Sequence, residues 1–428
     1  MRTLNTFLLS AAVMLAGSVS VMAAEAEASI DSGDTAWMLT STLLVLMMCL
    51  PGLALFYGGL VRAKNVLSIF VQCFAMAGVM SLLWVAFGYA VAAGEGGNAF
   101  FGWDSKMLFL NHLTDESVSG SIPESVWITF QMTFIIISPA IIVGAFAERM
   151  KFAAVLIFTI LWTVLSYLPM WHMAWGGGLF HHWGAIDFAG GNVVHINAGI
   201  AGLVACLFVG KRKGFPGPAL VPHNVPYVLI GAALLWVGWF GFNAGSAGAA
   251  SASAGMAMLT TQIATAAAVV VWMALEWIIS KKPTAVGAAT GAVAGLVAIT
   301  PAAGSAGVMG AMAMGAISSL VCYFAVTTLK HKLNYDDSLD VFGVHGMGGI
   351  VGALLTGVFI RGEDGGSVLQ FWIQAKSVMV TIVWSGLAAA FALTVAKVLC
   401  GGLRVAEEVE DGGLDRTDHG EEAYNWES

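Results

Sequence analysis

Charged residues are scarce in this sequence. Lys, Arg, Asp and Glu make up 10% of the 428 residues, whereas hydrophobic residues make up 58%. Soluble globular domains carry roughly 25% charged residues, so a water-soluble fold is excluded. The formal net charge of -8 does not describe a broad acidic surface, because nine of the acids lie in residues 404–428.

Cysteine is also rare, and its pattern excludes two kinds of site. The five cysteines lie in apolar stretches without a CxxC pair, which predicts neither a disulfide framework nor a zinc site. The sequence also lacks an HExxH motif and a convincing nucleophile motif. We therefore expect no enzymatic activity, no cofactor and no nucleic-acid partner.

The first residues have the pattern of a secretory signal peptide. Arg2 is followed by an apolar run over residues 7–16 and by small residues that end in Ala23 and Ala24. This order of charged, apolar and small residues is typical of a segment that is cleaved after translocation. We expect residues 1–24 to be removed and the mature N-terminus to lie outside.

Long apolar runs are abundant. About 20 helical residues cross a hydrocarbon core of ~30 Å. Eleven such runs lie near residues 35–58, 65–93, 125–147, 152–175, 190–209, 225–246, 256–280, 284–303, 306–328, 341–360 and 369–402. The sequence therefore predicts an all-α integral membrane protein, with a membrane domain over residues 25–403 and a cytoplasmic tail over residues 404–428.

The basic residues predict the orientation of these spans, because short cytoplasmic loops are enriched in Lys and Arg. One set of alternate loops holds Arg62, Lys64, Arg149, Lys151, Lys211, Arg212, Lys213, Lys281, Lys282, Lys330 and Lys332. The other set holds only Lys106 and Arg361. We expect a multi-pass protein of the cytoplasmic membrane with its N-terminus outside and its C-terminus in the cytoplasm.

An internal repeat relates the fifth and tenth spans. Both contain V-H-x-x-x-G-I-x-G, which begins at Val194 in one copy and at Val344 in the other. Five spans separate the copies, so the two halves have opposite orientations, as in many transporters. Chance similarity between glycine-rich helices is the alternative. The eleventh span, about 34 residues or ~50 Å long, is outside the repeat; we expect it to tilt and to brace the bundle.

His195 and His345 occupy equivalent positions in this repeat. Ionisable residues in membrane spans are costly and usually mark a pathway or relay, so the pair is a candidate for a pore or proton relay. Each could instead be a packing residue. Contact between them requires the glycine-containing segments 187–191 and 340–343 to dip into the protein.

A second candidate cluster is predicted from depth in the membrane. Its members should lie close to the outer face: Phe130, Phe134, Trp175, Trp239, Phe242 and Ser246. Aromatic faces attract small cations, with about 0.5 to 2 kcal/mol for each ring, so a cation vestibule is one interpretation. An interfacial aromatic belt is the other.

Asp187 precedes the first histidine segment, and two roles are open for it. It can cap or anchor the start of the fifth span, or it can bind a cation directly. A free carboxylate in a narrow pore would trap a cation, which favours the capping role.

Several motifs resemble the ammonium transporter family, the Amt, Mep and Rh proteins, and within it the bacterial Amt type. They are Pro51-Gly-Leu-Ala-Leu-Phe-Tyr-Gly-Gly, Phe130-Gln-Met-Thr-Phe134, Asp187-Phe-Ala-Gly-Gly-Asn-Val-Val-His195, Trp236-Val-Gly-Trp-Phe-Gly-Phe-Asn-Ala-Gly-Ser246 and Asp340-Val-Phe-Gly-Val-His345. The resemblance covers essentially the whole mature chain and implies eleven helices, in an inverted repeat of five plus five and a last helix, assembled as a homotrimer.

The resemblance also implies roles for individual residues. Phe134, Trp175 and Ser246 would bind ammonium, with Phe130 and Trp239 nearby, and Phe134 and Phe242 would form a stacked gate. His195 and His345 would line an apolar pore for ammonia or ammonium, and Asp187 would support the binding site. The family pattern assigns no role to Trp171, His181 or His182.

The resemblance further implies a cytoplasmic partner, a PII-type nitrogen-regulatory protein that meets the tail and the basic loops. Read alone, the acidic tail is a solvated segment. Two alternative functions stay open: an ammonium sensor that uses the same pore, and a membrane metalloenzyme with His195, His345 and Asp187 as ligands.

Overall fold

The computed structural model describes residues 29–217, 220–361 and 366–424, so the predicted signal peptide lies outside the described residues. Within these ranges, eleven helical segments are long and apolar enough to cross a membrane. They are Ser32–Leu60, Ala63–Ala93, Glu124–Phe146, Phe152–His182, Gly191–Val209, Val225–Gly245, Ala252–Ser280, Ala285–Ala302, Val308–Leu333, Phe342–Phe359 and Val368–Leu399. Each overlaps one predicted span, which confirms the all-α membrane fold.

Several of these segments combine helices of different pitch, and others are single helices. The first half contains α2 (Ser32–Met47), η1 (Met48–Leu53), α3 (Ala54–Leu60), η2 (Ala63–Asn65), α4 (Val66–Leu83), η3 (Trp84–Gly88), α5 (Tyr89–Ala93), α6 (Glu124–Phe146), α7 (Phe152–Trp162), η5 (Thr163–Tyr167), α8 (Leu168–Trp175), α9 (Leu179–His182), η6 (Gly191–Ile196) and α10 (Asn197–Val209). The second half contains α11 (Val225–Gly245), α12 (Ala252–Ser280), α13 (Ala285–Ile299), η7 (Thr300–Ala302), α14 (Val308–Phe324), η8 (Ala325–Leu329), α15 (Lys330–Leu333), η9 (Phe342–Gly346), α16 (Met347–Phe359) and α17 (Val368–Leu399).

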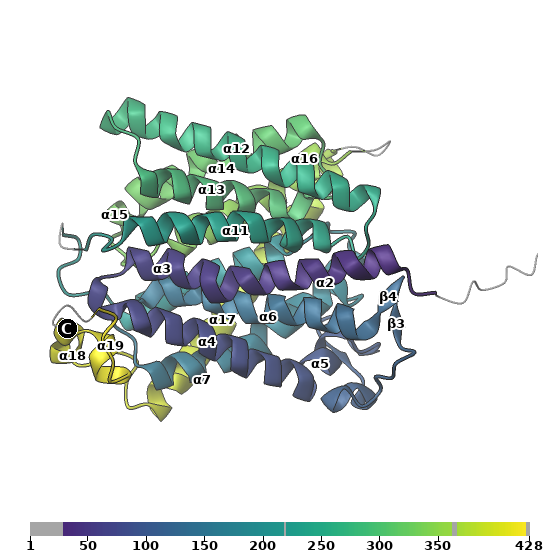
Figure 1. Ribbon diagram of the computed structural model, residues 1–428, viewed down its shortest axis with the longest axis horizontal. Coiled ribbons are helices and arrows are strands. Elements are labelled where there is room, and N and C mark those ends of the chain that lie inside the picture. Colours follow the sequence, from purple (N-terminus) through teal and green to yellow (C-terminus); the bar gives the residue numbers. More distant parts are fainter. Residues whose placement is uncertain (1–28, 218–219, 362–365, 425–428) are drawn as a thin grey trace, which may run out of the picture.

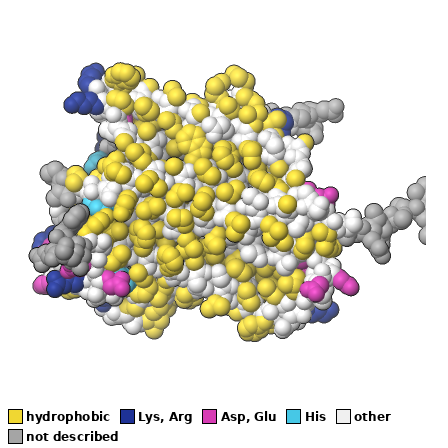
Figure 2. Space-filling model, in the orientation of Figure 1, with side chains coloured by type: hydrophobic (Ala, Val, Ile, Leu, Met, Phe, Trp, Pro, Cys, Tyr) yellow, Lys and Arg dark blue, Asp and Glu magenta, His cyan; other side chains and the backbone are white. Residues whose placement is uncertain are grey.

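The helices run side by side between two ends of the molecule (Figure 1). Hydrophobic side chains cover the middle of the visible face, and charged side chains lie towards the two ends (Figure 2). This is the surface expected where lipid surrounds a helix bundle, because charge is costly in the hydrocarbon core. We call the end that carries residues 404–424 the tail side and the end that carries the connection 94–123 the loop side.

Reciprocal contacts between the two repeat copies support the inverted repeat. A Cβ on Gly199 would lie 2.3 Å from the Gly346 nitrogen, and a Cβ on Gly349 would lie 3.1 Å from the Ile196 nitrogen. Gly199 and Gly349 are equivalent repeat positions, and so are Ile196 and Gly346. The glycines let α10 and η9 cross closely, because a side chain there would meet backbone.

The last membrane helix, α17, braces the bundle, as its length and place outside the repeat predicted. It packs against α7, α10 and α16. Its Ser385 hydroxyl donates to the Asn197 carbonyl at 2.7 Å, and its Thr381 hydroxyl donates to Asn192 Oδ1 at 3.2 Å. These buried hydrogen bonds hold η6 and α10 against α17, since leaving a buried carbonyl or amide oxygen without a donor is costly.

The connection on the loop side forms two short hairpins and a 3-10 helix. β1 (Gly96–Gly97) pairs with β2 (Gly102–Trp103), β3 (Val118–Ser119) pairs with β4 (Ile122–Pro123), and η4 covers Ser105–Leu110. Buried His172 in α8 bridges the carbonyls of Ala92 and Asn98 at 2.9 and 3.1 Å. This histidine anchors the connection to the bundle, a role that the sequence did not reveal.

The tail packs against the bundle and is not simply solvated. α18 (Glu407–Gly412) and α19 (Leu414–Asp418) lie against the tail side (Figure 1). Leu414 and Asp415 are buried, and the Asp415 carboxylate accepts hydrogen bonds from the Ser68 and Leu67 amides at 2.7 and 3.0 Å. The tail is therefore docked and not a wholly solvated segment, because one of its acids, Asp415, caps the first turn of α4.

Candidate functional site

The two histidines meet at the centre of the repeat. His195 Nδ1 lies 3.2 Å from His345 Nδ1, the ring centroids are 5.3 Å apart, and both side chains are buried. Each histidine lies in a π-helical turn, η6 or η9, at the start of its span. The sequence permitted this contact, and the structure shows it.

This contact constrains the protons on the imidazole rings. When both rings are neutral, one Nδ1 must carry the hydrogen and the other must accept it. The donor ring then has a bare Nε2, and its partner carries hydrogen on Nε2. His195 Nε2 has no hydrogen-bond partner within the described ranges of the chain. The pair can therefore offer one acceptor and one donor outside their shared bond. The two arrangements exchange only if the central proton moves while one Nε2 gains a proton and the other Nε2 loses one.

Aromatic rings cover the loop side of the histidines. Phe134 and Phe242 stack with centroids 4.3 Å apart, and the rings of Phe130 and Trp175 meet Phe134 edge to face at 5.0 and 6.0 Å. Phe130, Phe134 and Phe242 are fully buried. The rings fill the space on this side of the histidine pair, and aromatic faces of this kind attract small cations.

Trp239 contacts the histidine pair as well as the aromatic cluster. Its ring stacks on His195 with centroids 5.3 Å apart, and its Nε1 donates to the Thr300 hydroxyl at 2.9 Å. It also contacts Phe242, at 5.3 Å. Trp239 therefore connects the stacked phenylalanines to the histidine pair.

Between these rings lies a very small apolar cavity of about 10 Å³. The cavity is lined by Met48, Leu53, Phe56, Ile137, Ile141, His195, Leu235, Trp239, Phe242, Val293 and His345. Its size is that needed by a single water-sized molecule. Apart from the imidazoles and the indole the walls carry no polar group, so they discourage a bare ion.

Trp175 and Ser246 have polar partners of their own. The Trp175 indole donates to the Asp187 carbonyl at 2.7 Å, and the Ser246 hydroxyl donates to the Phe242 carbonyl at 2.8 Å. Since each group uses its hydrogen internally, the Ser246 oxygen keeps lone pairs that can accept a hydrogen bond. The Trp175 face stays available for a cation.

Trp171 supports this cluster, which the sequence alone did not indicate. Its indole donates to Gln131 Oε1 at 2.8 Å, and its ring meets Trp175 edge to face at 5.8 Å. Trp171 and Trp175 are one helical turn apart, a spacing that could have suggested the contact. His181 and His182 are exposed in α9.

Asp187 caps the first histidine segment. One carboxylate oxygen accepts from the Gly190 and Gly191 amides at 2.9 and 2.5 Å, and the other accepts from the Asn192 and Val193 amides at 2.8 and 3.2 Å. Burial raises the pKa of the carboxyl, while these four donors favour the ionised form and limit the rise. Of the two roles that the sequence left open, the geometry favours the cap.

A larger cavity of about 550 Å³ opens from His345 towards the tail side. Phe56, Tyr57, Ser338, Leu339 and Asp340 form part of its wall. Lys330 also lines it and donates to Asp340 Oδ1 at 2.7 Å. The histidine pair is thus bordered by packed aromatic rings on one side and by a polar cavity on the other.

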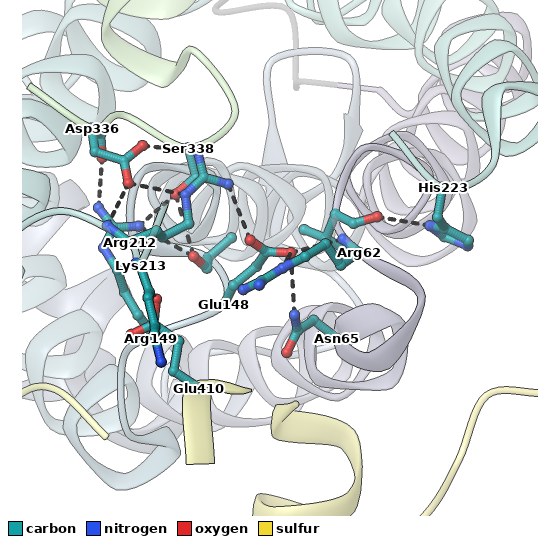
Figure 3. Close-up of polar contacts among 12 residues, drawn as sticks. Arg62, Asn65, Glu148, Arg149, Arg212, Lys213, His223, Asp336, Ser338 and Glu410 are labelled. Carbon is teal, nitrogen blue, oxygen red and sulfur yellow. Dashed lines mark hydrogen bonds and ion pairs between the residues drawn. The ribbon is translucent and has the colours of Figure 1, made fainter. Parts of the chain in front are cut away.

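A buried ionic network lies beside this cavity, and two of its members, Arg212 and Ser338, form part of the cavity wall. Figure 3 shows the contacts within the network. Arg212 binds both oxygens of Asp336, at 3.0 and 2.8 Å, and donates to Glu148 at 3.1 Å. Burial opposes ionisation of Glu148, but the positive charges of Arg212 and Arg62 outweigh it and lower its pKa. Asp336 is held ionised in the same way.

The tail joins this network through one buried acid. Glu410 accepts from the Lys213 amide at 2.7 Å and from the Arg404 guanidinium at 2.6 Å (Figure 3). Arg149, fully buried, donates to the Asp336 carbonyl and the Ser338 hydroxyl, both at 2.5 Å. Breaking one partner of such buried charges is strongly destabilising, so the tail and the cavity wall form one structural unit.

Comparisons with known proteins agree over nearly the whole chain. The model of the Ammonium Transporter Family matches residues 36–424. The ammonium transporter of Aquifex aeolicus is 48% identical, covering 95% of this chain and 96% of the relative, and that of Bacillus subtilis is 45% identical, covering 92% and 98%. Both relatives are matched along almost their full length.

Solved structures give the same answer. The crystal structure of Candida albicans Mep2 has a TM-score of 0.83 and 32% identity, covering 89% of this chain and 88% of Mep2. A structure described as a sensor Amt protein has a TM-score of 0.84 and 29% identity, covering 90% and 98%. The family model matches most of the chain, two ammonium transporters align with it along nearly their full length, and solved structures share its fold. This chain therefore belongs to the ammonium transporter family.

Proposed function

We propose that this protein recruits ammonium from outside the cell and passes it through the pore bordered by His195 and His345. The observation that carries this proposal is the order of groups along one line. Aromatic faces at Phe130, Phe134 and Trp175 are followed by the histidine pair and then by a polar cavity. An ammonium ion would lose its water at the aromatic faces, and the transported species would regain water in the cavity.

Neutral ammonia is the species that fits the narrow section. A bare cation in an apolar pore costs far more than the aromatic faces return. Ammonium would therefore lose a proton beside the rings, and ammonia would donate to or accept from the imidazoles. Phe134 and Phe242 act as the gate, Ser246 accepts a hydrogen bond from ammonium, Trp239 extends the aromatic wall and Asp187 holds the first histidine segment in place.

The sensor alternative uses the same site, and the likeness to a sensor Amt protein favours keeping it. Measured ammonium accumulation in liposomes separates the two, because a signalling pore need not accumulate substrate. The metalloenzyme alternative has weaker support. Asp187 directs both oxygens to backbone amides, and the two imidazoles bond to each other, so these groups do not converge on a common point.

Assembly and partners complete the proposal. We infer a homotrimer with one pore in each subunit, embedded in the cytoplasmic membrane, and a PII-type regulatory protein on the tail side. The docked tail supports the second inference, since Glu410 and Asp415 tie it to the loops around the cavity mouth. A regulator that moved the tail would disturb the buried network of Arg212 and Asp336.

Trp175→Leu should raise the ammonium concentration for half-maximal transport about fivefold, because losing one cation-attracting face costs of order 1 kcal/mol. Uptake at a series of ammonium concentrations measures this. Trp372→Leu is the matched control, since Trp372 is exposed on α17. Equal effects of the two substitutions would favour an interfacial belt over a binding site.

The loop side should face outwards. In a Cys400→Ser background, which removes the one cysteine that is not fully buried, Glu116→Cys should react with a membrane-impermeant maleimide in intact cells. Lys332→Cys, equally exposed on the tail side, should react only after permeabilisation. The reverse pattern would invert the topology predicted from the basic loops.

A further inference from the structure

The repeat relates two aspartates as well as two histidines. Asp187 and Asp337 each lie eight residues before their histidine, so the separation of 150 residues between His195 and His345 also separates the acids. Asp337 Oδ2 accepts a hydrogen bond of 2.7 Å from the amide of Phe342, the first residue of η9. Asp337 is therefore the cap of the second histidine segment.

The two caps use their oxygens differently. In Asp187 each carboxylate oxygen accepts hydrogen bonds from two backbone amides. Asp337 is fully buried, yet its Oδ1 has no hydrogen-bond partner in residues 29–217, 220–361 and 366–424. A proton on Asp187 would displace an amide, whereas a proton on Asp337 Oδ1 leaves the cap intact. Only the second acid is free to carry a proton.

Asp337 is fully buried and does not itself line the large cavity, but the residues that follow it do. The three residues that follow it, Ser338, Leu339 and Asp340, line that cavity together with His345. The carboxylate of the preceding acid, Asp336, forms an ion pair with Arg212. The titratable groups within electrostatic range of Asp337 come from several elements: Tyr57, Cys206, Lys330, Tyr335 and Asp340.

The charge balance around Asp337 suits a group that gains and loses protons. Burial and then the negative charge of Asp340 raise its pKa to about 6, while Lys330 and the backbone amides of Phe342 and Val341 act in the opposite direction. Below that pH the carboxyl is mostly neutral, and above it the carboxylate has an unpartnered oxygen in a buried site. Such a poised acid is a frequent feature of functional sites.

We propose that Asp337 binds the transported proton at the cytoplasmic end of the pathway and returns it to ammonia in the large cavity. This rests on the proposed function, because it requires ammonium to be split on the outer side. In the step, ammonia or a relaying water reaches the buried Oδ1 from the cavity, the O–H bond of Asp337 breaks, and an N–H bond forms on ammonia. The remaining carboxylate is then protonated by the proton that the next ammonium releases.

The test is an ammonium pulse on oriented proteoliposomes, with charge movement and ammonium accumulation measured at internal values from about pH 5 to about pH 8, a range that brackets the titration. Wild-type charge movement should fall as internal pH drops below about 6, because Asp337 then retains its proton. Asp337→Asn should reduce charge movement about tenfold, equivalent to ~1.4 kcal/mol, and abolish its dependence on internal pH. Half-saturation at the outer site should not change.

Two further variants make the test independent of how well Asp337→Asn folds. Lys330→Gln keeps the acid and its cap but removes a positive charge, so the midpoint on the internal pH scale should become more alkaline. Asp411→Asn removes an exposed acid of the tail and should leave the midpoint unchanged. An unmoved midpoint in Lys330→Gln, or a folded Asp337→Asn with the wild-type pH profile, overturns the assignment.

The outcomes also separate this inference from the function on which it rests. If the wild type accumulates ammonium without charge movement at any internal pH, transport stands but no proton crosses, and the role of Asp337 is rejected. If the wild type accumulates no ammonium at all, the transport function itself fails.

Discussion

His195→Ala and His345→Ala should each lower ammonium transport about tenfold, and the double substitution should be scarcely worse than either single one. The reason is their shared Nδ1 hydrogen bond of 3.2 Å. Once one ring is gone, the other has lost the partner that sets its proton position, so removing it costs little more. Losing a hydrogen bond worth about 1.4 kcal/mol corresponds to the tenfold effect.

Transport rates of the four proteins in one double-substitution cycle measure this coupling. Selectivity must be measured with the rate, because alanine widens the cavity and can admit potassium. His182→Ala, at an exposed position in α9, controls for the loss of any histidine. Additive effects of the two alanines would show that the rings act separately, and normal rate and selectivity in both single variants would make them packing residues.

Asp187→Ala should abolish transport and destabilise the protein by at least about 3 kcal/mol, since it leaves four backbone amides at the start of η6 without their acceptor in a buried site. The turn that places His195 would lose its cap. Trp175 would be disturbed as well, because its indole donates to the carbonyl of residue 187.

Asp187→Asn distinguishes the cap from a direct ligand for the cation. Its single amide oxygen can still accept backbone hydrogen bonds, so stability and transport should be partly retained. Thermal unfolding of the purified protein and ammonium uptake are the two measurements. Asp115→Ala, at an exposed position in the loop 94–123, is the matched control. A normally stable Asp187→Ala protein without ammonium binding would make Asp187 a ligand instead.

The membrane spans could be predicted because lipid imposes a simple rule on sequence. A helix that crosses hydrocarbon needs an apolar run of a certain length, and all eleven runs became helices. The boundaries were less certain. The fourth segment extends to His182, beyond the predicted end near residue 175, because α9 adds a turn after the glycines at 176–178.

The site was predictable to the extent that it follows from the repeat and from depth. The repeat paired His195 with His345, and depth grouped Phe130, Phe134 and Trp175. Depth did not indicate that the rings of Trp239 and Phe242 stack on His195, because residues at one level of the membrane can have different neighbours. The support from Trp171 and Gln131 was missed, because a hydrogen bond between distant helices leaves no local pattern.

The sequence by itself determined the helical membrane fold, the inverted repeat and the identity of the central histidines. These depend on hydrophobicity and on equivalent positions, which can be read along one chain. Only the tertiary structure decided which polar groups have hydrogen-bond partners and which do not. Asp187 accepts hydrogen bonds from four amides, its repeat partner Asp337 has one oxygen without a hydrogen-bond partner among the residues that the structure describes, and the acidic tail is docked. The reason is physical: hydrogen bonds and burial depend on atoms brought together from distant segments, and two acids with the same repeat position can therefore have different chemistry.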